Sequence, residues 1–264
     1  MPEPHTRAVA DNLCRAMQFF GRARRGGEVQ EQPGVCIVSC GLNYAAFNAA
    51  VLTDIVGADS RELMRRIQLP ASYYNPRNLR WTYWVCDDYL DKGLRREVNN
   101  VFARCGLRPL TEAPGMYADH LSAPARVLPQ IDVRPVADQT TRTAFAWITS
   151  TTFEIPHAIC SAIYGGEQAW AGDFKGYVGF LGGQAITTAA VVVTGGLIGF
   201  YSVATLTDYR RFGYAEATMR KIYEKVRQES GLQHTALQAT RSGYGLYERM
   251  GYRRITNFSV YVTN

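Results

Sequence analysis

The sequence lacks a hydrophobic run long enough to cross a membrane as one helix. Its longest apolar stretch, Ala185–Val203, is interrupted by threonines and glycines, whereas a transmembrane helix needs about 20 largely apolar residues. Positive charge is not concentrated in one region either, because residues 1–130 and residues 131–264 each carry a net charge of +3. We therefore expect no membrane span and no nucleic-acid partner. The apolar stretch is predicted to form two buried strands and a turn.

Metal-binding and disulfide motifs are missing as well. The six cysteines contain no CxxC pair, and the four histidines are far apart in the sequence, whereas a zinc site needs closely spaced ligands. The N-terminal residues are polar and do not form the apolar segment of a signal peptide. We therefore expect reduced thiols, no bound metal and a cytoplasmic location.

The overall composition, with 47% hydrophobic and 20% charged residues, is typical of a globular protein. A chain of 264 residues corresponds to one large or two modest domains. Residues 121–135 contain three prolines and little periodicity, as linkers do. This segment places the predicted boundary between a domain at 1–130 and a domain at 131–264.

Hydrophobic periodicity predicts a mixed α/β (α+β) fold on a largely antiparallel sheet. Before the linker, it predicts helices at 6–25, 60–67 and 92–105 and strands at 34–40 and 79–86. After the linker, it predicts helices at 140–151, 156–164, 213–230 and 243–250. The strands predicted in this second part are 131–135, 176–181, 185–193, 197–206, 234–239 and 258–262.

The segment from Leu206 to Ala215 carries the first motif that points to chemistry. A strand ends in a turn, and a helix begins at the pattern Arg-x-x-Gly-x-Ala, which starts at Arg210. Gly213 lets the backbone approach a bound group, and the free N–H groups of the first helical turn form an anion site. Arg210 and Arg211 add positive charge. On spacing alone, the motif fits a phosphate-binding loop or an ordinary helix start.

A second motif lies near the end of the chain, between Leu237 and Tyr252. A strand ends there, and a short helix presents the pair Leu246-Tyr247 before it stops at Gly251. On its own, Tyr247 fits a half-buried aromatic side chain whose hydroxyl reaches the surface.

Together the two motifs resemble the GNAT superfamily of N-acyltransferases. In that family, Arg/Gln-x-x-Gly-x-Gly/Ala cradles the pyrophosphate of coenzyme A, and Asn-x-x-Ala-x-x-Leu-Tyr supplies a tyrosine that protonates the leaving thiolate. The resemblance covers most of residues 131–264. It implies an N-acyltransferase that moves an acyl group, by default acetyl, from a pantetheine thioester such as acetyl-CoA to a primary amine of a small molecule by direct attack.

The first half of the chain is similar to the N-terminal half of bacterial tandem GNAT proteins, in which a degenerate lobe precedes an intact one. The segments that carry this similarity are 41–48, 81–85, 106–108 and 114–116. The resemblance implies two GNAT-like lobes, each a mostly antiparallel mixed sheet flanked by helices, of which only the second has an intact cofactor motif.

The resemblance also implies roles for individual residues. Tyr247 takes the general-acid position, where a phenol with a pKa of about 10 can donate to a thiolate. Glu154, which precedes the second helix of the second domain, is the candidate general base. The implied cofactor-binding residues are Val203, Ala204, Thr205, Arg210, Arg211, Gly213, Tyr214, Ala215 and Thr240. The implied acceptor-binding residues are Asn43, Trp84 and His157, with Asn48 and Trp81 as further candidates, and core packing is the alternative for both tryptophans.

Three positions depart from the family pattern, namely Phe212, Thr240 and Gly243. Phe212 removes a charge near the phosphates and adds bulk. A donor without the adenosine 3′-phosphate, such as the phosphopantetheine arm of an acidic acyl carrier protein, loses least from these changes. The alternatives are therefore a carrier-protein-dependent enzyme and a non-catalytic coenzyme A-binding or scaffold protein. An aminoacyl-tRNA-dependent transferase is disfavoured by the even charge distribution.

Overall fold

The computed structural model describes residues 4–263 and divides into two compact units. The first unit contains the chain up to Gly115 together with the strand that continues from Arg254, and the second contains Met116–Arg253. The last strand of the chain therefore belongs to the first unit. The boundary predicted at residues 130/131 falls within the second unit.

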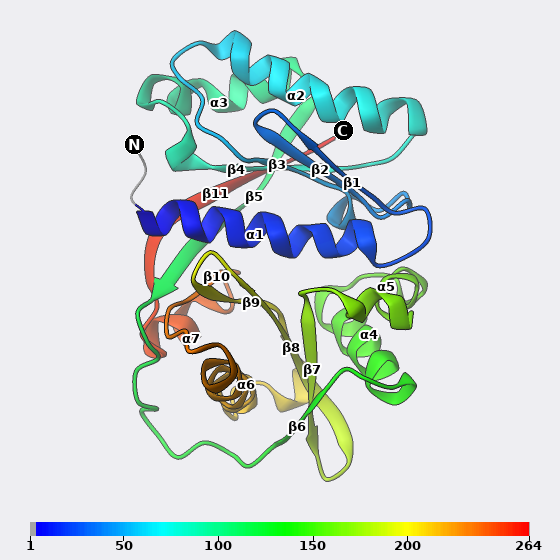
Figure 1. Cartoon of the computed structure of the whole chain (residues 1–264), viewed down its shortest axis with the longest axis vertical. Helices are drawn as coiled ribbons and strands as arrows, with labels where there is room; N and C mark the ends of the chain where they lie inside the picture. Colours follow the sequence, from blue (N-terminus) through cyan, green and yellow to red (C-terminus); the bar gives the residue numbers. More distant parts are fainter. Residues whose placement is uncertain (1–3, 264) are drawn as a thin grey trace. The chain divides into compact units, whose positions relative to one another are not determined.

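The first unit is built on a mixed sheet (Figure 1). Strands β1/β2, β2/β3 and β4/β11 pair antiparallel, whereas β3/β4 pair parallel. Parallel neighbours need a crossover connection, and α2 lies on the connection from β3 to β4. The elements are α1 (Pro4–Arg22), β1 (Glu28–Gln32), β2 (Val35–Ser39), β3 (Ala49–Leu52), α2 (Ser60–Tyr74), β4 (Thr82–Cys86), α3 (Lys92–Arg104), β5 (Leu107–Ala118), which ends in the second unit, and β11 (Arg253–Thr263), which begins there.

The three helices and two strands predicted in this part of the chain are all present, but β1, β3 and β5 were not predicted. Aromatic side chains fill much of the core. Trp81 stacks on Tyr74 with ring centroids 5.2 Å apart, and Phe102 stacks on Tyr261 at 3.7 Å. Tyr261 lies on β11, so the last strand supplies part of this core.

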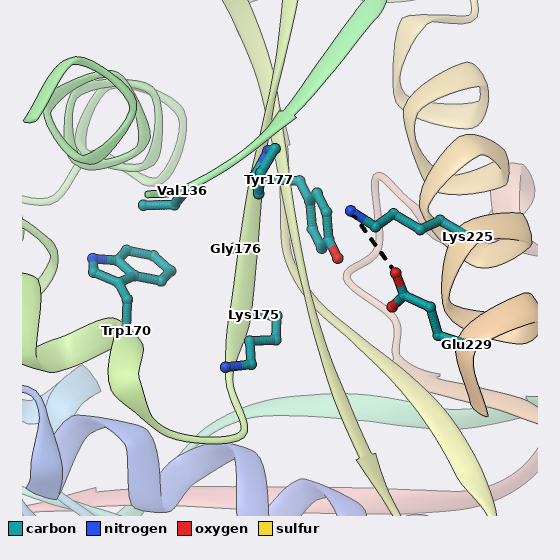
Figure 2. Close-up of a pocket in the computed structure, with 8 residues that line it drawn as sticks. Val136, Trp170, Lys175, Gly176, Tyr177, Lys225 and Glu229 are labelled. Atoms are coloured by element: carbon teal, nitrogen blue, oxygen red, sulfur yellow. Dashed lines mark ion pairs between the residues drawn. The ribbon is translucent and has the colours of Figure 1, made fainter. Parts of the chain in front are cut away.

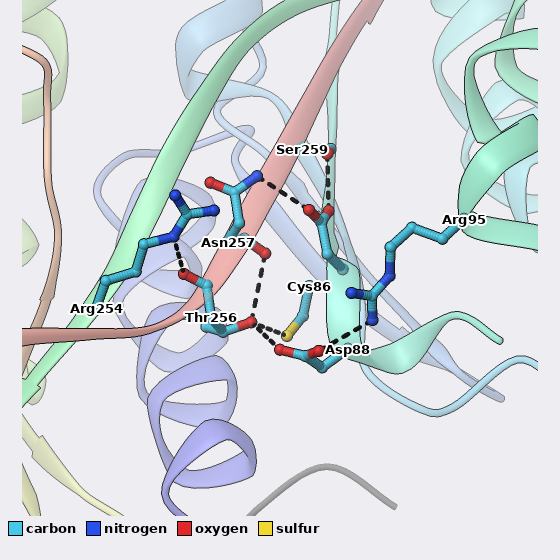
Figure 3. Close-up of polar contacts among 8 residues, drawn as sticks. Cys86, Asp88, Arg95, Arg254, Thr256, Asn257 and Ser259 are labelled. Atoms are coloured by element: carbon cyan, nitrogen blue, oxygen red, sulfur yellow. Dashed lines mark hydrogen bonds and ion pairs between the residues drawn. The ribbon is translucent and has the colours of Figure 1, made fainter. Parts of the chain in front are cut away.

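A polar network fixes β11 beside the end of β4 (Figure 3). Thr256 donates a 2.7 Å hydrogen bond to Asp88, which also pairs with Arg95 at 2.9 Å. Asn257 and Ser259 both donate to the carboxylate of Asp87, at 3.0 and 2.7 Å. The network satisfies these carboxylates within the first unit.

The second unit has the strand order β10-β9-β8-β7-β6. Pairs β6/β7, β7/β8 and β8/β9 are antiparallel, whereas β9/β10 is parallel. Helix α6 lies on the crossover from β9 to β10. The elements are β6 (Asp132–Pro135), α4 (Gln139–Phe153), α5 (His157–Tyr164), β7 (Lys175–Leu181), β8 (Gln184–Thr194), β9 (Leu197–Thr205), α6 (Tyr214–Ser230), β10 (Thr235–Gln238) and α7 (Tyr244–Arg249).

The two units share one succession of elements. In each, consecutive antiparallel strands lead to a parallel pair whose crossover is a helix, namely α2 in the first unit and α6 in the second. This internal repeat matches the expectation of two lobes of one fold. Every element predicted after residue 130 is present, and the two glycine pairs 182–183 and 195–196 form the turns between β7 and β8 and between β8 and β9.

In the second unit, α6 and α4 cover opposite faces of the sheet (Figure 1). The face under α6 is packed by alternate strand residues, among them Ile198 and Phe200 of β9 and Leu237 of β10. All six cysteines are free thiols in this structure. No helix within residues 4–263 is long and apolar enough to span a membrane.

Candidate cofactor-binding site

Strand β9 contains a bulge in the part that carries predicted cofactor residues. The step from Thr188 to Ala190 on β8 is opposed by the longer step from Ala204 to Tyr201 on β9. The extra residue lies at Ser202, whose φ of 48° is left-handed. Bulges of this kind bend a strand and end its regular pairing.

Past the bulge, β9 and β10 no longer pair. Their parallel register ends at Phe200 and Leu237, although β9 continues. The carbonyl oxygen of Ala204 accepts a 2.7 Å hydrogen bond from Oγ1 of Thr187 on β8. Because backbone groups alternate in direction along a strand, those of Val203 point away from β8. Val203, rather than Ala204, is therefore placed to pair with an extended ligand.

Helix α6 follows β9 after a short turn and begins without a side-chain cap. Its N-cap is Gly213, with φ of 95°, which has no side chain to cap the first turn. The N–H groups of Tyr214 and Ala215 have no intrahelical acceptor, and the helix dipole adds positive potential there. This N-terminus can therefore hold an anionic group such as a pyrophosphate.

Three arginines surround this helix start. Arg210 donates from Nε to the carbonyl of Thr205 at 3.0 Å, and Arg126 donates to the carbonyl of Arg211 at 3.2 Å. Within residues 4–263, no ion pair joins any of the three to a carboxylate. Sequence reasoning missed Arg126, because it lies in the predicted linker and belongs to no motif. Its charge therefore adds to those of the two predicted arginines.

The corresponding crossover helix of the first unit has a different start. Asp59 caps α2 by accepting a 2.9 Å hydrogen bond from the backbone N–H of Arg61. A carboxylate thus occupies the position that an anionic ligand would need. Beyond the paired part of β3 and β4, Val56 and Leu90 form a further parallel bridge, and Val56 donates to Tyr89 at 2.7 Å. The first unit therefore lacks both features of the candidate site.

Tyr247 lies on α7 and is 7% exposed. It belongs to the hydrophobic cluster between α6 and the sheet. Burial raises the pKa of Tyr247 to about 12, above the value of about 10 expected from the sequence. The phenol therefore keeps its proton at neutral pH.

The three departures from the family pattern have local explanations. Oγ1 of Thr240 accepts a 3.2 Å hydrogen bond from the N–H of Gly243, so it caps the turn into α7. A Cβ at Gly243 would lie 2.8 Å from a ring carbon of Tyr247, so glycine gives that ring its room. Phe212 is 65% exposed, with its ring centroid 6.5 Å from that of Tyr214. Its ring is therefore mostly exposed to solvent beside the start of the helix.

Glu154 and His157 lie together at the junction of α4 and α5. Glu154 is the C-cap of α4, exposed, with a left-handed φ of 55°. His157 is exposed at the start of α5, where its Nε2 lies 3.2 Å from Oγ of Ser161. These residues are accessible to a substrate on the α4 side of the sheet, whereas Tyr247 packs on the α6 side.

The acceptor residues predicted in the first half have contacts within the first unit. Oδ1 of Asn43 accepts from the backbone N–H of Arg80 at 2.8 Å, and Trp84 donates to Thr82 at 3.2 Å. Asn48 is fully buried and bonded to three backbone groups. Trp81 is also fully buried. The packing alternative thus holds for Trp81, and Asn48 has a structural role.

A cavity of about 190 Å³ lies at the edge of the second unit's sheet (Figure 2). Trp170, Lys175 and Tyr177 line it, together with Lys225 and Glu229 of α6, which form a 4.0 Å ion pair with each other. None of the predicted site residues lines this cavity. No group of three or more histidine, cysteine or acidic side chains that could hold a metal occurs within residues 4–263.

Comparison with known structures supports this assignment of the fold. A GCN5-related N-acetyltransferase from Kribbella flavida aligns with a TM-score of 0.72 and 14% identity, over 100% of this chain and 96% of that one. A GCN5-related N-acetyltransferase from Sphaerobacter thermophilus aligns with a TM-score of 0.58 and 16% identity, over 99% and 93%. A functionally unknown conserved protein from Staphylococcus epidermidis gives 0.61 and 11%, over 89% and 92%. The similarity of fold thus includes the residues of the first unit.

Sequence comparison identifies the family of the second unit. No curated protein sequence matches the chain at a significant level. The model of the acetyltransferase (GNAT) family matches residues 134–252, which include β6, the bulged strand β9, α6 and α7. Residues 134–252 are therefore a domain of the acetyltransferase (GNAT) family.

Proposed function

We propose that the second unit is an acyl-CoA-dependent N-acyltransferase that acylates a primary amine of a small molecule. The observation that carries this proposal is the uncapped start of α6 directly after the bulged end of β9. An anion site and a strand edge on consecutive elements suit one ligand that has a pyrophosphate followed by an extended arm. Coenzyme A has this structure.

Different residues around this site are proposed to bind different parts of acyl-CoA. In the proposal, the N–H groups of Tyr214 and Ala215 bind the pyrophosphate, and the backbone of Val203 pairs with the pantetheine arm. Gly213 suits this role because a Cβ there would lie 3.1 Å from Arg126 and 3.2 Å from Pro129. The cations beside the loop add electrostatic attraction for the phosphates.

The chain's own groups then supply proton transfer and orientation. Bound acyl-CoA provides an acyl group activated as a thioester. Glu154 accepts a proton from the attacking amine, directly or through water, while the C–N bond forms. Tyr247, which its raised pKa keeps protonated across the neutral range, donates its proton toward the sulfur as the C–S bond breaks. Direct transfer needs no covalent enzyme intermediate, so alignment of the two substrates is the chain's main contribution.

Calorimetric titration with acetyl-CoA tests the proposal directly. We expect binding with a Kd of about 1–100 μM, within the range of ordinary enzyme substrates, followed by amine-dependent release of coenzyme A when a panel of primary amines is supplied. Binding without turnover of any amine would favour the scaffold alternative. If acetyl-CoA and coenzyme A both fail to bind, the proposed function is wrong.

An acyl carrier protein is the second candidate donor, and Phe212 is the observation that favours it. Its exposed ring stands beside the phosphate-binding turn, where the family often has a basic or small residue. A hydrophobic side chain at this place suits contact with a partner protein better than contact with a free nucleotide.

Phe212→Arg distinguishes the two donors. The added charge is expected to tighten coenzyme A binding about threefold to tenfold, since an exposed charge near phosphates contributes about 1 kcal/mol. The gain should shrink in 0.5 M salt because screening weakens exposed charges. Phe212→Gln is the matched control, which removes the ring without adding charge. If Phe212→Arg gives no gain over this control, the missing charge does not explain donor choice.

A further inference from the structure

The side chain of Gln238 is unusual among the residues that the structure describes. Both of its polar atoms, Oε1 and Nε2, are buried and have no hydrogen-bond partner. Every other described side chain with such an atom has only one, whereas Gln238 has two, a donor and an acceptor. Buried amides are normally hydrogen-bonded, so this group requires an explanation that lies outside the chain itself.

Gln238 is placed where the two parallel strands separate. Leu237, the preceding residue, forms the last registered pair of β10 with β9. Leu237 and Ala239 both pack in the cluster under α6 that contains Tyr247. Since side chains alternate along a strand, Gln238 points to the opposite face, which α4 covers at β7, β8 and β9. The amide is therefore beside the point where β9 and β10 stop pairing, on the face opposite the cluster that contains Tyr247.

A carboxamide offers one donor and one acceptor side by side, so its partner must present an acceptor next to a donor. A thioester carbonyl oxygen and the N–H of an attacking amine form such a pair when they approach each other. We propose that Gln238 binds this reacting pair, with Nε2 donating to the thioester carbonyl and Oε1 accepting from the amine. This inference rests on the proposed acyltransferase function and specifies how that site recognises its acceptor.

The role requires no proton on or from Gln238. The amine nitrogen forms the new bond to the carbonyl carbon, the bond from that carbon to sulfur breaks, the amine proton leaves to the base, and the sulfur receives the proton of Tyr247. Gln238 only orients the two reactants, and its donor stabilises the negative charge that develops on the carbonyl oxygen. The acceptor must consequently carry at least one N–H that remains available to Oε1 during attack.

Two stable thioethers of coenzyme A, with unmodified coenzyme A as the reference, test this inference without turnover. S-carbamoylmethyl-CoA carries a primary amide, with an acceptor and a donor side by side, whereas S-isobutyl-CoA has the same shape without polar groups. Calorimetry on the wild-type protein is expected to show tenfold or greater preference for the carbamoylmethyl compound over the isobutyl one. In Gln238→Leu the preference should fall to twofold or less, while the affinity for unmodified coenzyme A stays within twofold of wild type.

Gln233→Leu is the matched control, because Gln233 is an exposed glutamine just before the same strand. It should retain the wild-type preference. Gln238→Leu should also raise the melting temperature, since it removes a buried amide without a partner, and Gln238→Met provides a second test if the leucine variant does not fold. A preference that survives in Gln238→Leu, or one that is missing in the wild type, overturns the inference. Failure of the wild type to bind coenzyme A at all would instead refute the proposed function on which it rests.

Discussion

Gly213→Trp is expected to weaken coenzyme A binding about 100-fold or more, which corresponds to about 2.7 kcal/mol. The indole would occupy the space in front of the first turn of α6, where the pyrophosphate is proposed to bind. Its Cβ alone would lie within 3.2 Å of side-chain atoms of Arg126 and Pro129. Titration calorimetry with coenzyme A measures the loss.

The control for this variant lies at the other end of the same helix. Gly231 follows the last turn of α6 with φ of 72°, and a Cβ there would meet no atom within 4 Å. Gly231→Trp therefore has a similar backbone strain, of about 1–2 kcal/mol, without approaching the site. Comparable melting temperatures for the two variants, together with normal affinity in Gly231→Trp alone, would assign the loss to the site. Normal affinity in Gly213→Trp would show that the loop has been misinterpreted.

Tyr247→Phe is expected to lower kcat by about 100-fold, the usual size of a general-acid contribution. The affinity for acetyl-CoA should change little, because the hydroxyl acts when the C–S bond breaks. Tyr244→Phe, which removes a hydroxyl from the same short helix, is the control and should stay near the wild-type rate. An unchanged kcat in Tyr247→Phe would remove this residue from the mechanism.

The pH dependence provides a second readout of Tyr247. A general acid must be protonated, so its loss decreases the rate as pH rises through its pKa. Burial places that pKa at about 12 instead of the ordinary value of about 10. The phenol should therefore stay protonated up to about pH 11, and kcat should not fall between pH 8 and 10 through its ionisation. A decline in kcat centred near pH 10 that disappears in Tyr247→Phe would contradict this pKa.

Most of the second unit could be predicted from the sequence because its strands are apolar and its turns contain glycine pairs. The missed strands of the first unit have weaker signals. β1 is formed by residues 28–32, which are almost all polar, and β5 contains Pro109 and Pro114, which usually argue against a strand. That β11 would join the first unit also could not be predicted, since periodicity says nothing about which strand pairs with which.

Some residues of the candidate site could likewise be predicted from the sequence, and others could not. The turn with Gly213 and the tyrosine of α7 could be found because each belongs to a motif with defined spacing. Arg126 could not, since only the folded chain brings it within 3.2 Å of the carbonyl of Arg211. Gln238 looks like an ordinary strand residue, and its significance comes from two polar atoms that folding buries without partners. Long-range packing, rather than local pattern, determines both.

The pairing of β11 with β4 has a consequence for the order in which the protein folds. Domains of a long chain commonly fold one after another as they emerge from the ribosome. Here the first unit cannot complete its sheet until β11 has been synthesised, after the whole of the second unit. Phe258 and Tyr261 of β11 pair with Cys86 and Tyr83 of β4. The unit that is synthesised first is therefore completed last. A stop codon before β11 would remove a strand from the first unit, although the truncation lies at the C-terminal end of the chain.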